Sequence, residues 1–225
     1  MRTLLDMVQE LWRESGSGGP EPQTIETTNG GEVERLLGWI IRADHEVQSL
    51  HTDWQFMWRN SLVLTVAGTA IYQAPIGLRQ YDEVSFLLDD QRLPVVDYLY
   101  VRGEYIDPLP NRPYRAVRMP NRSLRLDSIP DQEYRLSYDW YVQPTRIDRT
   151  LGNGATSIIP SEYLAIVIAR ALMHYANYEN APELMPTATD MYNTWKMALE
   201  ADQLPGKREA HMQAEGNLDM DIFIA

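Results

Sequence analysis

The sequence predicts an α+β protein: a helical bundle built from the N- and C-terminal segments, an inserted antiparallel β-sandwich or barrel-like domain, and an extended C-terminal arm. Three observations predict this fold class. Apolar residues recur every three or four positions before residue 60 and again after residue 160, which is the period of helices that bury one face. Between these segments apolar and polar residues alternate, as in strands. The chain then closes with an apolar tip that follows a polar stretch.

The longest helical pattern runs from Gly31 to Asn60 and predicts a single helix of about 28 residues. Asn29 is expected to cap this helix, and Glu32 to supply an acidic first turn. Asp44 interrupts the apolar stripe, and the C-terminal end is aromatic around Trp54. We expect the other elements to pack on this helix. Its apolar stripe consists of Val33, Leu36, Leu37, Ile40, Val47, Leu50, Trp54 and Met57.

Three further helices are expected on the same grounds. Residues 3–14 form a short helix with Thr3 as the cap, followed by the loop SGSGGPEP. A second helix is expected from Ser161 to Tyr178, and a third from a cap at Thr187 to about Gln203. The third helix is expected to direct four side chains inward: Met191, Trp195, Ala198 and Leu199.

The middle of the chain reads as short strands joined by turns. The clearest strand is 134–142, where four side chains share one face, and 115–119 and 123–126 flank Pro120-Asn121-Arg122 as a hairpin. A short helix is favoured over a strand for 97–106. The shared face of the clearest strand carries Tyr134, Leu136, Tyr138 and Trp140. Other strands are expected at 61–66, 70–74, 82–88 and 92–96.

These elements suggest a discontinuous domain. Residues 1–60 and 150–206 are expected to form the helical bundle, 61–149 the inserted β domain, and 207–225 an extended arm. The arm alternates like a strand near its end and is expected to add to a partner's sheet edge or groove. A disordered terminus is the alternative. The residues of the arm expected to bind a partner are Leu218, Met220, Ile222, Phe223 and Ile224.

Composition excludes several classes of protein. A net charge of −12 and a pI near 4.7 leave no basic face of the kind that reads duplex DNA. With no cysteine, neither disulfides nor thiolate metal sites can form. No apolar run reaches the ~20 residues that span a bilayer. Asp6 and Glu10 lie where a signal peptide would be apolar, so we expect a soluble protein made in a cytoplasm.

A search for chemistry gives no catalytic, cofactor or metal site. His45 and His51 are six positions apart and do not share a helix face, and neither GxSxG nor HExxH occurs. His174 is expected to be an ordinary packed or surface histidine. Glu162 and Asp53 are the least implausible carboxylate pair for a glycosidase. A charge at a helix N-terminus and a local hydrogen bond explain these two better, so we expect no enzyme.

Four segments resemble the head–tail adaptor, or connector, proteins of tailed bacteriophages, and together they cover most of residues 1–206. The first is LLDMVQELWRESG, which a Gly/Thr-rich loop follows. The second is RLLGWIIRADHEVQSLHTDWQFMWRN, and the third is LRLDSIPDQEYRLSYDWYVQP. The fourth is IPSEYLAIVIARALMHYANYENAPEL with the later YNTWKMALEADQLPG.

The resemblance implies a structural virion protein without a cofactor. Such adaptors form a homo-oligomeric ring, commonly of about twelve subunits, that docks under the portal protein and continues the DNA channel. They provide the attachment site for tail nozzle, tube or fibre proteins at the virion neck, after assembly in the host cytoplasm. Viral DNA passes through without specific binding, and no membrane is involved. Two alternatives remain: a tail-associated peptidoglycan hydrolase, and another tail or nozzle structural module.

Overall fold

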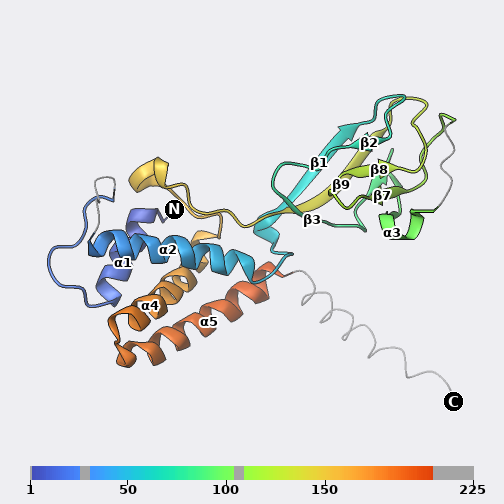
Figure 1. The fold of residues 1–225 in the computed structure, drawn as a ribbon. Coiled ribbons are helices and arrows are strands. Elements are labelled where there is room, and N and C mark those ends of the chain that lie inside the picture. Colours follow the sequence, from blue (N-terminus) through green and yellow to red (C-terminus); the bar gives the residue numbers. More distant parts are fainter. Residues whose placement is uncertain (1, 26–30, 104–108, 205–225) are drawn as a thin grey trace, which may run out of the picture. The chain divides into compact units, whose positions relative to one another are not determined.

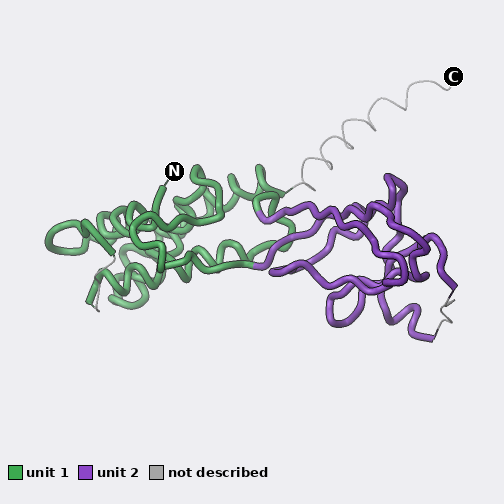
Figure 2. Tube along the Cα trace, turned by 90° about the horizontal axis from the view of Figure 1, so that it is seen from above, with its two compact units in different colours: residues 1–56, 144–225 green, residues 57–143 purple. Residues whose placement is uncertain are grey.

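The computed structural model describes residues 2–25, 31–103 and 109–204 (Figure 1). The chain divides into two compact units: unit 1 comprises residues 1–56 and 144–225, and unit 2 comprises residues 57–143 (Figure 2). Helices from both ends of the chain pack together in unit 1, and the sheets lie in unit 2, which confirms the α+β class. The division expected at 60/61 and 149/150 stays a prediction about domains. The expected arm, 207–225, lies outside the described residues.

Unit 1 is a bundle centred on the helix α4. This helix contacts helices from both ends of the chain, namely α1, α2 and α5, and these elements lie side by side in Figure 1. Most of the α4 side chains are buried, because it has neighbours on several faces. The bounds of the bundle helices are α1 Leu4–Glu14, α2 Glu32–Ser49, α4 Ala165–Glu179 and α5 Met185–Gln203. Short 3-10 turns lie at Arg149–Gly154, Ser161–Tyr163 and Pro182–Leu184.

The expected capping of α1 is confirmed. The Asp6 backbone N–H donates to Thr3 Oγ1 at 3.2 Å, and the Thr3 N–H donates to Asp6 Oδ2 at 2.8 Å. This reciprocal arrangement is a capping box, which satisfies two backbone donors at the start of the helix. The Thr3 backbone hydrogen bond lowers the pKa of Asp6. The buried face of the helix carries Leu4, Val8, Leu11 and Trp12, as the apolar spacing predicts, but Met7 is buried in place of the expected Leu5, which is half-buried.

The prediction of one helix from Gly31 to Asn60 was wrong. α2 ends at Ser49, residues 55–57 form a 3-10 turn, and the strand β1 begins at Trp58. Two causes act here. The segment 51–53 contains Thr and Asp, which favour local side-chain hydrogen bonds over helix, and the residues after it gain a full strand partner. Gly31 is the N-cap, with φ +88° and no side-chain capping bond, and Asn29 lies outside the described residues.

The last helices start differently from the prediction. Residues 161–163 form a 3-10 turn before α4, and Asn180, with φ +55°, ends that helix in the left-handed conformation. Thr187 is not a cap: α5 begins at Met185, because Pro186 suits the first turn of a helix, where its missing N–H costs nothing. The expected inward position of Ala198 was also wrong, since it is exposed. Leu199 is buried as expected.

Unit 2 contains two sheets around one apolar core. One sheet has the strand order β1-β9-β4-β5, with β3 also paired to β9, and the other has the order β2-β8-β7-β6. Strands β1 and β9 run side by side along their length (Figure 1). The strands of the first sheet are β1 Trp58–Leu64, β3 Leu78–Tyr81, β4 Leu87–Leu88, β5 Gln91–Arg92 and β9 Arg135–Val142. Those of the second are β2 Ile71–Tyr72, β6 Val95–Asp97, β7 Ala116–Arg118 and β8 Leu124–Leu126.

The core of unit 2 forms where the strand pattern predicts it. All four residues of the shared face of 134–142 are buried, together with aromatic and aliphatic side chains of β3, β4 and β8. Phe86 stacks on Tyr138 with the ring centroids 4.9 Å apart, and Tyr81 meets both rings edge-on. The core residues are Leu78, Tyr81, Phe86, Leu88, Leu93, Ala116, Leu124, Leu126, Tyr134, Leu136, Tyr138 and Trp140.

Several details of the predicted strands were wrong. Residues 82–86 form a turn in which Ser85 N–H donates to Asp82 O at 3.1 Å, so only Leu87–Leu88 of the expected strand 82–88 is a strand. The expected strand 92–96 is divided between β5 and β6, which belong to different sheets. β6 pairs with β7 in parallel, so unit 2 is not wholly antiparallel. The hairpin of β7 and β8 and the short helix α3, Tyr98–Val101, are confirmed.

Trp54→Ala is expected to destabilise the protein by about 3–5 kcal/mol, because Trp54 is fully buried and its removal leaves a large cavity. Its ring stacks on Phe56 at 5.5 Å and meets His51 edge-on at 4.8 Å. Chemical denaturation measures the free energy of unfolding. Trp58→Ala is the control, because Trp58 is 44% exposed and loses less contact. A loss below ~1 kcal/mol for Trp54→Ala would contradict its place in the core.

Candidate interaction surfaces

Strand β1 combines an unpaired edge with exposed leucines. Among the described residues β1 pairs with β9 alone, and it lies at the end of the strand order of its sheet. Val63 lies opposite Leu136, on the face of the sheet that carries the core. Its neighbours Leu62 and Leu64 therefore point to the other face, where they are 57% and 49% exposed. This side of the strand presents apolar side chains to solvent.

The backbone of the same residues faces outward along the sheet edge. Thr65 N–H donates to Tyr134 O at 2.9 Å, so the residues of β1 bonded to β9 are those in step with Thr65. The alternate residues Asn60, Leu62 and Leu64 direct their N–H and C=O groups away from β9. We call Asn60, Leu62 and Leu64 the β1 edge. An apolar, unpaired edge of this kind is a site for association with another chain.

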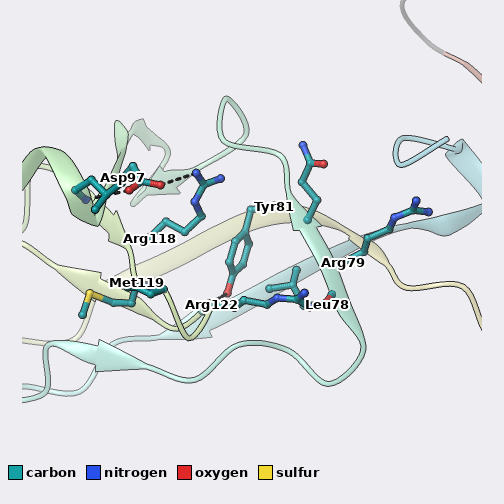
Figure 3. Close-up of a pocket in the computed structure, with 10 residues that line it drawn as sticks. Leu78, Arg79, Tyr81, Asp97, Arg118, Met119 and Arg122 are labelled. Atoms are coloured by element: carbon teal, nitrogen blue, oxygen red, sulfur yellow. Dashed lines mark hydrogen bonds and ion pairs between the residues drawn. The ribbon is translucent and has the colours of Figure 1, made fainter. Parts of the chain in front are cut away.

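A second candidate surface is an arginine-lined cleft of about 660 Å³ in unit 2, between β3, α3 and the hairpin of β7 and β8 (Figure 3). The Arg118 guanidinium points to Asp97, with Nη2 2.8 Å from Oδ2, and also bonds Glu83. The hydrogen bond from Arg118 lowers the pKa of Asp97. Below the Tyr81 ring, Arg122 Nη1 donates to Leu78 O at 2.8 Å.

Both arginines of the cleft, Arg118 and Arg122, thus already have hydrogen-bond partners within the same chain. The Tyr81 hydroxyl donates to Arg122 O at 3.0 Å, so the turn at Arg122, whose φ is +68°, is held to β3 from both its side chain and its carbonyl. Arg118, on β7, binds Asp97 at the end of β6 and Glu83 in the turn after β3. The cleft is therefore best explained as a clamp that fixes the hairpin of β7 and β8 on the first sheet.

In unit 1, helices α2 and α4 share a charged cluster around Glu46. Its carboxylate accepts from Arg42 at 2.8 Å, from Arg170 at 2.7 Å, and lies 3.1 Å from His174 Nε2. Burial alone would raise the pKa of Glu46, but the hydrogen bonds from Arg170 and Arg42 lower it to about 2. Burial lowers the pKa of His174, and Glu46 opposes that effect. The cluster links α2 to α4 and gives His174 a structural partner.

Asp44, which interrupts the apolar stripe of α2, is a fully buried carboxyl. Gln48 Nε2 donates to Asp44 Oδ2 at 2.6 Å, and the Ser157 hydroxyl donates to Oδ1. Gln48 also exchanges two hydrogen bonds with the backbone of Thr145, at 2.9 and 3.0 Å. Burial raises the pKa of Asp44 to about 6, while the Ser157 and Gln48 hydrogen bonds oppose this. The network ties α2 to the segment 145–157.

The other residues considered for chemistry lie apart from these networks. His51 Nε2 is 2.8 Å from Glu200 Oε1. Asp53 and Glu162 are both exposed to solvent. Within residues 2–25, 31–103 and 109–204, no group of three or more His, Asp or Glu side chains could hold a metal ion. No helix in this part of the chain has the length and apolarity to span a membrane. His211 lies outside the described residues.

Comparison with known families decides what kind of protein carries these surfaces. The family model described as SU10 adaptor protein matches residues 2–215. The chain belongs to the SU10 adaptor protein family. It is therefore a phage head–tail adaptor, which confirms the resemblance found in the sequence. No curated protein sequence matches the chain.

The adaptor match spans the sequence of both units and ends before the apolar tip of the chain. The tip residues expected to bind a partner follow the matched region and lie outside the described residues: Leu218, Met220, Ile222, Phe223 and Ile224. The β1 edge was missed in the sequence, which predicts a strand at 61–66 without showing which of its faces is exposed. The alternation was visible, but a period-2 pattern does not say which face is solvated.

Asp44→Asn is expected to remove a pH dependence of stability. The pKa of Asp44 is raised from 3.8 to about 6 in the folded adaptor, so the folded state binds more protons than the unfolded state between these values. The wild type should therefore lose stability as pH rises from about 4 to about 6, by roughly 1–3 kcal/mol from this group. Urea unfolding at a series of pH values measures it.

The difference between wild type and Asp44→Asn isolates this group from other titrations. Glu46, whose pKa is lowered to about 2, changes stability in the opposite direction and in a more acidic window, because the folded state then binds fewer protons. It contributes equally to both proteins and cancels in the difference. A difference in unfolding free energy that stays constant between pH 4 and 7 would contradict a buried, titrating Asp44.

Proposed function

We propose that this adaptor forms a ring that docks under the portal, extends the DNA channel and provides the attachment site for tail nozzle, tube or fibre proteins. The observation that supports this most strongly is the match to the adaptor family across residues 2–215. Its function is structural, and the proposal includes no catalytic step. The ring is proposed to contain about twelve copies and to form the neck of the virion.

The charge of the chain supports a channel lining rather than a DNA-binding role. A net charge of −12 means that a ring of copies presents a strongly negative field to the phosphate backbone. DNA binds proteins largely through exchange of phosphate counterions for Lys and Arg, and here acidic residues outnumber basic ones, 32 to 20. DNA would therefore pass through the ring without adhering to its wall.

Within this proposal the parts of the chain have different roles. The helices of residues 1–60 and 150–206 build the ring, and residues 61–149 face tail components. The arm, 207–225, contacts the portal or a neighbouring subunit through its apolar tip. Apolar and acidic residues alternate at the start of this tip, a pattern that suits pairing with a strand or groove.

A peptidoglycan hydrolase is not favoured by any feature described above. Such an enzyme needs one carboxyl held protonated by an apolar environment, and both Glu162 and Asp53 are exposed to water. Zymography with purified protein tests this alternative. Clearing that is lost in Glu162→Gln would favour the enzyme.

Mixing purified chain with a portal ring tests the proposal directly. The complex is expected to saturate at about one copy of the chain per portal subunit, because each portal subunit offers one equivalent site in a symmetric ring. Native mass spectrometry measures the ratio. Absence of binding, or binding that does not saturate, would contradict the adaptor ring.

Removal of residues 207–225 is expected to abolish association with the portal or between subunits while leaving the melting temperature unchanged. The reason is that the proposed arm makes its contacts with another chain and not with the bundle and sheets of its own chain. Thermal melting and the same mass measurement test both parts. A control variant replaces 207–216 by a Gly/Ser linker and keeps the apolar tip, and it should still associate. Unchanged association after the deletion would remove the arm from the proposal.

A further inference from the structure

The exposed edge of β1 and the last residues of the chain have complementary patterns. The β1 edge offers an unpaired backbone over Asn60, Leu62 and Leu64, with leucines that are about half exposed. The sequence LDMDIFIA at positions 218–225 alternates apolar and acidic residues and then ends apolar. A strand of this pattern can bond to an open edge through its backbone and match its two faces separately.

We propose that residues 218–224 of one copy add as a parallel strand to the β1 edge of a second copy. The inference rests on the proposed ring, because it requires two copies side by side. A tail on one copy and an edge on the next are two different surfaces, so the contact is heterologous. Repeated from copy to copy, a heterologous contact produces a ring when its rotation closes.

The parallel direction follows from matching the side chains on the solvent face of β1. With Leu62 beside Ile222, Leu64 lies beside Ile224 and Trp58 beside Leu218. All three pairs are apolar, so the added strand would cover side chains that are now 44–57% exposed. Same-face neighbours on adjacent strands contribute most of the stability of a strand pair.

The other face of β1 agrees with the same register. It places Asp219 beside Arg59 and Phe223 beside Val63. An acidic residue is thereby set against a basic one, and an aromatic ring covers a half-buried residue at the margin of the core. A shift by one residue would reverse every one of these matches, because successive side chains point to opposite faces.

The antiparallel direction fits less well. An antiparallel register can also fill the solvent face, with Leu218 beside Leu64 and Ile224 beside Trp58. On the other face, however, that register sets Asp219 beside Val63, so an acidic side chain falls at the margin of the core. The parallel register uses every apolar residue of the tip except Met220, which lies beside Asn60.

The arginine-lined cleft is a poorer receptor for the acidic tip than the β1 edge. Arg118 and Arg122 already bond Asp97, Glu83 and Leu78 O, so an acidic strand there would compete with existing partners. The β1 edge offers backbone groups that have no described strand partner. The tip therefore fits the edge better than the cleft.

Cysteine cross-linking tests the register, because the chain has no cysteine of its own. One full-length variant carries Leu62→Cys and a second carries Ile222→Cys, and the two are mixed under mild oxidation, alone and with the portal ring. Adjacent strand positions lie within disulfide range, so an interchain disulfide is expected on a non-reducing gel. The matched control replaces Leu62→Cys by Val84→Cys, since Val84 is an exposed apolar residue outside β1, 67% exposed.

Yields of this cross-link decide between the alternatives. The cross-linked yield of Leu62→Cys with Ile222→Cys should exceed that of the Val84→Cys control by at least about tenfold. Equal yields would overturn the β1 edge as the receptor. A higher yield for Leu64→Cys with Leu218→Cys would overturn the parallel direction, because that pair is adjacent only in the antiparallel register.

A binding measurement separates this inference from the adaptor function. The receptor is the full-length chain with its own tip apolar residues changed to serine, and the probe is a fluorescent peptide of residues 215–225. Anisotropy should show saturable binding that weakens at least about tenfold in Leu62→Asp. Val84→Asp should bind as the parent does, and melting temperatures of both variants confirm that they fold.

The two failures are distinguishable. If the peptide does not bind the parent receptor, or binds Leu62→Asp equally well, the edge contact is overturned. The saturable complex of the wild-type chain with the portal ring would in that case still stand. If the portal complex fails while the peptide binds β1, the adaptor ring under the portal is wrong and the contact between copies remains.

Discussion

The packing of α4 against helices from the start of the chain is the constraint on which the rest of the structure depends. α4 comes late in the sequence, yet it contacts α1 and α2, and the Leu4 N–H donates to Ala155 O at 2.6 Å. Short helices are marginal in water on their own, so the helices at each end of the chain depend on this packing for most of their stability. The bundle therefore forms only when the ends meet, and everything between them must begin and finish close together.

Unit 2 satisfies this constraint through its first and last strands. β1 and β9 pair antiparallel along their length, from Trp58 opposite Tyr141 to Leu64 opposite Arg135. An inserted segment whose first and last strands pair in this way returns to the point at which it left. β9 is also the strand to which β3 and β4 bond, so the closing strand organises the whole first sheet. The same pairing thus closes the insertion and builds its core.

Much of this fold could be predicted from the sequence because its signals are local. The capping box at Thr3, the period of α4 and the alternation of 134–142 each depend on residues a few positions apart. The end of α2 could not be predicted in this way. Residues 54–58 continue a helical pattern, and only pairing with β9, about eighty residues later, makes Trp58 the start of a strand. Likewise, in the sequence Asp44 only interrupts the apolar stripe of α2. The structure shows that Ser157 and Gln48 donate hydrogen bonds to it, which explains a carboxyl at this buried position.

The candidate interface follows from the same pairing. Because β3 and β4 occupy one side of β9, β1 takes the other side and is left at the margin of its sheet. A chain that functions as a monomer commonly protects such a margin with lysine, proline or a bulge. β1 instead carries Leu62 and Leu64 on its solvent face, and its seven residues contain neither lysine nor proline. In a member of the adaptor family, such an open edge fits a surface that another chain covers when the virion assembles.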